Sequence, residues 1–346
     1  MIETTIIGLD VGKLIFQVHG VSADGKVTIK RRLRRSDVLK FFARLGRCIV
    51  GLEACGGSHF WAREIEAIGH DVRLIPAAYV KAYVKRGKTD AVDAEAICEA
   101  VSRPTMRFVP IKTANCQAAL MVLKSRDLLV RQRTQAINAV RGHLAELGIV
   151  AAKGLAKIGT LIAIVRDEND QRLPPAARMA LKLLVDQIEL LTDRIDALGR
   201  EVVAEVRRDD RMRRLSTIPG IGPITAATIQ ALVPDPGVFT SGRHLAAWIG
   251  LTPKMHSSGG KEQPGKISKM GNPTLRSLLV VGATALLRHA RRGATISPWL
   301  TALLKRRPAK VAAIALANKM ARIVWALLTK GGTFIQKHRT AEHAAA

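Results

Sequence analysis

The chain has 346 residues, of which 48% are hydrophobic, so it is long enough for two or three folded domains with apolar cores. Its 55 Lys and Arg residues against 28 Asp and Glu give a formal net charge of +27. Such an excess indicates a polyanionic partner, with nucleic acid the first candidate and an acidic membrane surface the second. Because Lys319 and Arg322 interrupt the apolar stretch 311–328, no run approaches the length of a spanning helix, and we expect no membrane-embedded segment.

The cysteines favour a reducing compartment. Cys48, Cys55, Cys98 and Cys116 lack the paired spacing of a zinc site, and three of them fall in apolar or helical segments. We therefore expect reduced thiols in a cytoplasm and assign them no chemistry.

Residues 1–110 alternate predicted strands and helices, which indicates one α/β domain. The strands are expected near 4–10, 14–21, 26–32, 47–53 and 72–75, and the helices near 36–45, 59–68, 77–85 and 90–102. Three strands in succession, then a helix, then a fourth strand that ends in an acid is the element order of an RNase H-like fold, an analogy at the level of the fold.

Four carboxylates stand at the ends of elements in this domain. Asp10 and Glu53 each follow Gly-Leu at the end of an apolar strand, whereas Asp90 and Asp93 fall on one side of the first helical turn. Mg²⁺ prefers carboxylate oxygens, and two such ions stabilise both the attacking and the leaving oxygen of a phosphate. Taken singly, each acid is more often a helix cap or a surface charge. As a set they predict a site for one or two Mg²⁺ ions.

Residues 111–207 are predicted to form a helical linker. Long helical patterns cover about 113–147 and 175–206, and a variable-looking connection, 148–174, lies between them. The pair indicates an antiparallel hairpin or coiled coil. Its many arginines are equally consistent with a solvated face and with contacts to RNA or DNA.

A tight Pro-Gly-Ile-Gly-Pro turn opens the third region, 208–332, and separates two helical halves. The pattern is typical of a helix-hairpin-helix, in which Gly220 and Gly222 let the backbone approach a phosphate and the second helix offers free N–H groups. An ordinary turn between helices is the alternative.

A basic loop follows in the same region, with Ser257-Ser258-Gly259-Gly260 between two lysines. A serine that attacks a DNA phosphate needs a mobile hydroxyl, glycine backbone beneath it and cations around it. On the residues alone, a flexible basic loop without catalysis is an equally good interpretation. From residue 236 onward, only two acids accompany eighteen Lys and Arg residues, so this third of the chain is expected to bind phosphates most strongly.

The ordered motifs of the chain resemble those of the DEDD transposases of the IS-one-ten insertion-sequence family, in particular its IS-eleven-eleven group. The resemblance runs nearly end to end, apart from 148–175 and the tail 333–346. The motifs are GLD at 8–10, GLE at 51–53, KTDAVD at 88–93, IPGIG at 218–222, GLTP at 250–253, SSGG at 257–260 and GKISKMGN at 265–272.

This resemblance implies a RuvC-like metal-binding domain, a coiled-coil linker, a mainly α-helical transposase domain with a helix-hairpin-helix, and a basic, disordered tail. Asp10, Glu53, Asp90 and Asp93 match the ligands for Mg²⁺. Ser258 matches the nucleophile, with Ser257 as the fallback. The nucleic-acid-binding residues are then expected to be Gly220, Gly222, Lys254, Lys261, Lys266, Lys269 and Arg276.

The resemblance further implies a reaction and its partners. The serine forms a covalent 5′-phosphoserine link to DNA, and a structured bridge RNA pairs with both donor and target DNA. Related proteins act as tetramers, dimers of dimers in which the acids of one subunit meet the serine of another, in the nucleoid of a bacterial cytoplasm.

Three alternatives stay open at this point. A metal-dependent RuvC-like junction nuclease uses the same acids without serine catalysis. An actin-like or sugar-kinase fold also places a GLDVG run before a hairpin, although it does not explain the charge. A non-enzymatic RNA- or DNA-binding protein requires only the helix-hairpin-helix.

Overall fold

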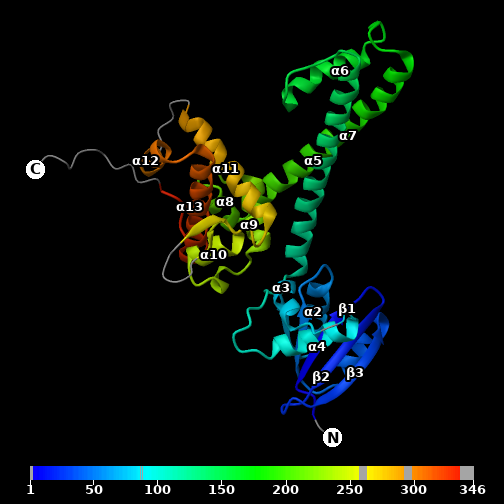
Figure 1. The fold of residues 1–346 in the computed structure, drawn as a ribbon, viewed down its shortest axis with the longest axis vertical. Helices are drawn as coiled ribbons and strands as arrows, with labels where there is room; N and C mark the ends of the chain where they lie inside the picture. Colours follow the sequence, from blue (N-terminus) through cyan, green and yellow to red (C-terminus); the bar gives the residue numbers. More distant parts are fainter. Residues whose placement is uncertain (1–2, 86, 88, 257–262, 292–297, 336–346) are drawn as a thin grey trace, which may run out of the picture. The chain divides into compact units, whose positions relative to one another are not determined.

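The computed structural model describes residues 3–335 apart from 86, 88, 257–262 and 292–297 (Figure 1). The chain separates into two compact units, Met1–Gln117 and Ala118–Ala346. Among the described residues, the first unit is mixed α/β around one sheet, and the second is mostly helical with one short β-hairpin.

A five-stranded sheet forms the centre of the first unit, with the strand order β3-β2-β1-β4-β5 (Figure 1). The first three strands are antiparallel neighbours, whereas β4 pairs in parallel with β1 and with β5. Each predicted strand is present with its ends within two residues of the expected ones. The bounds are β1 Ile6–Val11, β2 Ile15–Val21, β3 Val27–Arg34, β4 Ile49–Glu53 and β5 Asp71–Ile75.

Helices cover both faces of this sheet. Because side chains alternate along a strand, Ile7 and Leu9 of β1 are buried on one face with Trp61 of α2, while Ile6 packs on the other face with Ile97 of α4. The expected helix near 77–85 is a short helix followed by a 3₁₀ turn. The bounds are α1 Val38–Phe42, α2 Ser58–Ala67, α3 Ala77–Val80 and α4 Asp90–Val101.

The two predicted long helices are present as α5 (Ala114–Glu146) and α7 (Pro175–Arg208). The end of α5 and the start of α7 pack together with a third helix, α6 (Ile158–Arg166), around one apolar core. The segment 148–174 is therefore not merely the variable connection that the sequence suggested, since Leu161 and Val165 of α6 are fully buried in it.

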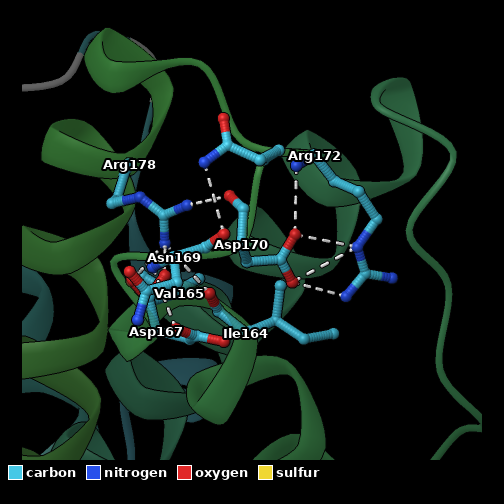
Figure 2. A network of polar contacts seen from close by, with 8 residues as sticks. Ile164, Val165, Asp167, Asn169, Asp170, Arg172 and Arg178 are labelled. Atoms are coloured by element: carbon cyan, nitrogen blue, oxygen red, sulfur yellow. Dashed lines mark hydrogen bonds and ion pairs between the residues drawn. The ribbon is translucent and has the colours of Figure 1, made fainter.

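Arg178 of α7 holds the connection between α6 and α7 (Figure 2). Its guanidinium donates hydrogen bonds to the carbonyl oxygens of Ile164 at 3.2 Å and Val165 at 3.3 Å, and also to those of Asp167 and Asp170. The last carbonyls of a helix have no partner within the helix, so this one side chain satisfies groups that would otherwise face solvent.

The sequence did not decide whether the linker arginines face solvent or contact nucleic acid, and some of them have hydrogen-bond partners within the fold. Arg141 donates to the carbonyl oxygens of Ala151 and Ala152, both at 3.0 Å, and Arg133 donates to the hydroxyl of Thr192 at 3.3 Å. These two guanidinium groups therefore support the α5–α7 arrangement.

The rest of the second unit is a helical bundle with a two-stranded hairpin. Its main core lies between α8, α9, α10, α11 and α13. The bounds are α8 Asp210–Leu215, α9 Pro223–Leu232, α10 Gly242–Ile249, β6 Pro253–Met255, β7 Pro264–Ile267, α11 Pro273–Arg291, α12 Pro298–Arg306 and α13 Ala309–Lys330.

The sequence indicated no segment as long as a membrane-spanning helix, and α13 differs from this expectation. It spans 22 residues and, by length and composition alone, is long and apolar enough to cross a membrane, although Lys319 and Arg322 lie within it. Core helices of soluble proteins pass the same test, and one such helix is weak evidence for a membrane span. Here Ala317, Met320 and Ala321 are buried in the core of the bundle, which explains part of the apolar composition.

Candidate active site

Two neighbouring strands place Asp10 beside Glu53. The parallel strands β1 and β4 pair Gly8 with Gly51, and each acid stands two positions further along its strand. Residues two apart point to the same face of a sheet, so both acids share the face of the two glycines. That face is covered by α4.

Helix α4 packs directly against the backbone of Gly8 and Gly51. A β-carbon on Gly8 would lie 2.1 Å from the carbonyl oxygen of Ala94, and one on Gly51 would lie 2.8 Å from the β-carbon of Val101. Any larger residue at either position would therefore lift the helix from the sheet. The sequence contained the signal, a repeated Gly-Leu-acid pattern, but sequence reasoning assigned the glycines no role.

The start of α4 supplies the other two acids. The helix begins at Asp90, and the hydroxyl of Thr89 accepts a hydrogen bond from the backbone N–H of Val92 at 3.4 Å, so Thr89 is the N-cap. Asp90 and Asp93 lie in the first turn, where the positive end of the helix dipole favours negative charge.

The four acids interact through their charges. The pKa of Asp10 is raised to about 6, first by burial and then by the charges of Asp90, Asp93 and Glu53, against a backbone hydrogen bond from Val11 that lowers it. Each of the other three acids therefore acts on Asp10. The structure thus brings together the complete set that the sequence singled out.

The donor set fits a hard divalent cation in its chemistry, since all four side chains are carboxylates and three of them act on the partly buried fourth. Among the described residues, no three His, Cys, Asp or Glu side chains already have the spacing of a metal site. The charges of the acids act on one another, but their oxygens would have to approach more closely to hold a cation.

The predicted nucleophile Ser258, its alternative Ser257 and Lys261 lie outside the described residues. The chain on either side of them pairs as a β-hairpin of β6 and β7. Sequence reasoning had expected only a loop here.

Three of the predicted cationic residues are exposed near this hairpin, namely Lys254, Lys266 and Lys269. Lys269 adopts a φ of 54°, a backbone conformation that side-chain-bearing residues seldom take. Arg276 is different, because its guanidinium donates to the carbonyl oxygens of Ile249 at 2.9 Å and Met270 at 3.2 Å. Arg276 therefore ties the segment before α11 to the end of α10.

The two glycines of the predicted phosphate-binding turn have different surroundings. Gly220 has a φ of 83° and packs on α11, since a β-carbon on Gly282 would lie 2.0 Å from its carbonyl oxygen. Gly222 is exposed, caps the N-terminus of α9 and has open space where a β-carbon would stand. Close helix packing explains the glycine at 220, and only Gly222 faces open space.

Comparison with known proteins relates the chain to transposases. A family model described as Transposase IS116/IS110/IS902 family matches residues 212–297, and a DEDD transposase model matches residues 7–149. The chain is 48% identical over 338 residues to a putative transposase of Sinorhizobium fredii, covering 97% of this chain and 87% of the relative.

Two further relatives match along almost their whole length. A probable family 20 transposase of Pseudomonas aeruginosa is 48% identical over 326 residues, or 94% of this chain and 96% of the relative. The transposase for insertion sequence element IS1111A of Coxiella burnetii is 40% identical over 338 residues, or 96% of this chain and 92% of the relative. The chain therefore belongs to the IS116/IS110/IS902 family of DEDD transposases, enzymes that act on DNA.

Proposed function

We propose that this transposase cuts and rejoins DNA strands through a covalent intermediate on Ser258, or on Ser257 if the neighbour is the nucleophile, with the help of Mg²⁺. The observation that carries the proposal is the coupled carboxylate cluster at the ends of β1 and β4 and at the start of α4. Such a cluster of like charges around a partly buried carboxyl is characteristic of a functional site and is stabilised by a cation.

Membership of a DEDD transposase family supports dependence on a divalent metal in general, and we propose one or two Mg²⁺ ions. Asp10, Glu53, Asp90 and Asp93 would hold them. A bound ion would lower the pKa of the attacking hydroxyl and neutralise charge on the phosphate.

In the proposed cleavage, the Oγ atom of Ser258 attacks the phosphorus atom of the scissile bond. The Oγ–P bond forms, the P–O3′ bond breaks, the serine loses its hydroxyl proton and the 3′ oxygen leaves as a hydroxyl. The phosphate stays on the protein as a 5′-phosphoserine ester, so the bond energy is kept for the rejoining step. Exposed Lys254, Lys266 and Lys269 are placed to offset the charge of the DNA backbone near the hairpin.

We further propose that the sheet unit is RuvC-like within 1–110, that 111–207 is a coiled-coil linker, and that 208–332 is the serine-bearing domain before the tail 333–346. The strand order with acids on β1, β4 and α4 supports the first assignment. The short helices α8 and α9, joined by the turn that contains Gly220, support a helix-hairpin-helix.

The proposed partners are donor DNA, target DNA and a structured bridge RNA, bound by a tetramer arranged as a dimer of dimers and associated with the bacterial nucleoid. The net charge of +27 supports extensive contact with nucleic acid phosphates. We assign Gly222, Lys261 and the three exposed lysines near the hairpin to these contacts, with Gly220 and Arg276 holding the backbone that presents them.

Recombination between two plasmids, one with the ends of the insertion sequence and one with its target, tests the proposal. Asp10→Asn and Ser258→Ala are each expected to abolish joined products while RNA binding, measured by gel shift, is retained. Ser257→Ala serves as the matched control and is expected to retain product. Activity of the Ser258→Ala protein together with loss in Ser257→Ala would move the nucleophile to Ser257, and activity of both would favour a metal-dependent junction nuclease without serine catalysis.

A further inference from the structure

A large apolar groove crosses the second unit and takes no part in the cluster of acids. Its volume is about 1660 Å³, above the range of about 300–1,000 Å³ that suits a drug-sized molecule, so it has room for an extended occupant. Its floor is the outer side of α13, and its walls come from the start of α10, the β6–β7 hairpin and Trp299 of α12.

The floor of the groove is apolar and exposed. Val311 of the floor exposes 49% of its surface, and Trp299 of the wall exposes 38%. Ile314, Ile323 and Ala326 of α13 also line the floor. Two polar side chains of the floor form hydrogen bonds with backbone carbonyl oxygens of the same unit. Asn318 donates to the carbonyl oxygen of Leu251 at 3.2 Å, and the indole N–H of Trp325 donates to that of Phe239 at 3.0 Å. The floor therefore offers flat apolar contact and little hydrogen bonding.

The residues lining this groove carry positive charge only. Six of them are cationic and none is acidic, and none of the six forms an ion pair with any described carboxylate. The ammonium of Lys319 lies 4.4 Å from the centre of the Trp299 ring, a cation–π contact that holds the indole at the groove. The six are Arg243, Lys266, Lys269, Lys310, Lys319 and Arg322.

An apolar floor with a cationic edge is complementary to a nucleic acid strand with unpaired bases. Phosphates are attracted to the cations, and bases present free apolar faces for stacking only when they are unpaired. A paired duplex would leave the floor empty, and an apolar peptide would leave the six cations without an anionic partner. Strand exchange by a transposase exposes unpaired DNA, so the occupant also follows from the proposed function.

We propose that the groove binds unpaired nucleotides of the DNA substrate, with one base stacked on Trp299. The identity of the occupant rests on the proposed strand transfer, whereas the location of the binding site rests on the groove alone. Lys266 of β7 belongs both to the hairpin and to the groove, and Lys269, two residues after β7 ends, also lines the groove. The bound strand would therefore run toward the hairpin that carries the predicted nucleophile.

Binding of a fluorescent oligo-dT strand of about 12 nucleotides to the full-length protein, measured by anisotropy, tests the proposal. Val311→Glu puts a negative charge on an exposed floor position and is expected to weaken binding about tenfold, which corresponds to about 1.4 kcal/mol. Val150→Glu, at a residue that is 80% exposed and outside the groove, changes the net charge equally and is expected to bind like the unmodified protein.

Intrinsic fluorescence gives a second readout that a merely structural role would not produce. Oligo-dT is expected to quench tryptophan emission in the unmodified protein and to quench it much less in Trp299→Phe. A paired duplex of equal length is expected to bind Val311→Glu and the unmodified protein alike, because the floor takes no part.

The proposal is overturned if Val311→Glu and Val150→Glu bind oligo-dT equally, or if oligo-U RNA binds at least tenfold more tightly than oligo-dT. It is also overturned if Val311→Glu changes only the oligomeric state in sedimentation, which would make the floor a contact between copies. None of these results changes the outcome expected from the recombination assay with the serine variants. Failure of the groove-binding proposal can therefore be distinguished from failure of the proposed covalent chemistry.

Discussion

Replacement of Asp10 by Asn is expected to stabilise the first unit in the absence of metal while it abolishes recombination. Burial, and then the charges of Asp90, Asp93 and Glu53, raise the pKa of Asp10 from 3.8 to about 6. A raised carboxyl pKa means that the folded state holds the proton more tightly than the unfolded state. This favourable contribution is present below about pH 4 and is lost as the pH rises through about 6.

The magnitude follows from the size of the shift. A change of about two pKa units corresponds to about 3 kcal/mol at about 1.4 kcal/mol per unit. The carboxylate is only partly buried, so solvent screening reduces the expected gain for Asp10→Asn to about 1–2 kcal/mol at pH 8. At about pH 3 the gain should vanish, because Asp10 is then protonated in both states.

Hydrogen exchange measured by mass spectrometry on peptides from β1 and α4, in the presence of a chelator, reports this free energy for the first unit alone. Asp37→Asn, at an exposed carboxylate of the same unit, is the matched control and should change little. Addition of Mg²⁺ should slow exchange in the unmodified protein and much less in Asp10→Asn. Faster exchange in Asp10→Asn than in the unmodified protein at pH 8 would refute the reasoning from crowded charge.

Two further changes test the packing that positions the site. Gly8→Ala should destabilise the first unit by about 3 kcal/mol in urea unfolding and disturb metal binding, because its new β-carbon would overlap the carbonyl of Ala94. The control Gly56→Ala places its β-carbon in open space and should be close to neutral. Equal effects of the two substitutions would contradict the close packing of α4 on Gly8. Arg178→Met should speed exchange in α6 by about tenfold, because it removes a donor to four carbonyls. Arg172→Met removes only a donor to the Asp170 carboxylate and should not speed this exchange. Unchanged exchange in Arg178→Met would show that the carbonyls are satisfied otherwise.

The acids of the site were predictable because each is marked locally. Asp10 and Glu53 end apolar strands after Gly-Leu, and Asp90 and Asp93 share a helical turn after a capping threonine. Their meeting depends on strand order, on register and on a helix that returns across the sheet. Gly8 reads locally as a weak strand residue, and its role emerges only when Ala94, far along the chain, lies against it.

Other features of the second unit depend on long-range packing that no local pattern encodes. The apolar groove combines the start of α10, the β-hairpin, Trp299 and one side of α13, and none of these segments alone indicates a binding site. The segment 148–174 lacked a family motif and a long periodic pattern, yet its short helix α6 is buried because α5 and α7 enclose it. Gly220 fits a phosphate-binding turn in sequence, although its close contact in the fold is with Gly282 of α11.

Mass spectrometry of the protein–DNA adduct tests the central claim most directly. A nicked substrate designed to trap the cleaved intermediate is incubated with the protein, the proposed guide RNA and Mg²⁺. The peptide from 254 to 269 is then analysed after nuclease digestion. We expect a nucleotide linked through its 5′-phosphate to Ser258, formed by the unmodified protein and absent in Asp10→Asn. Efficient DNA cleavage with neither Ser257 nor Ser258 modified would contradict the covalent mechanism.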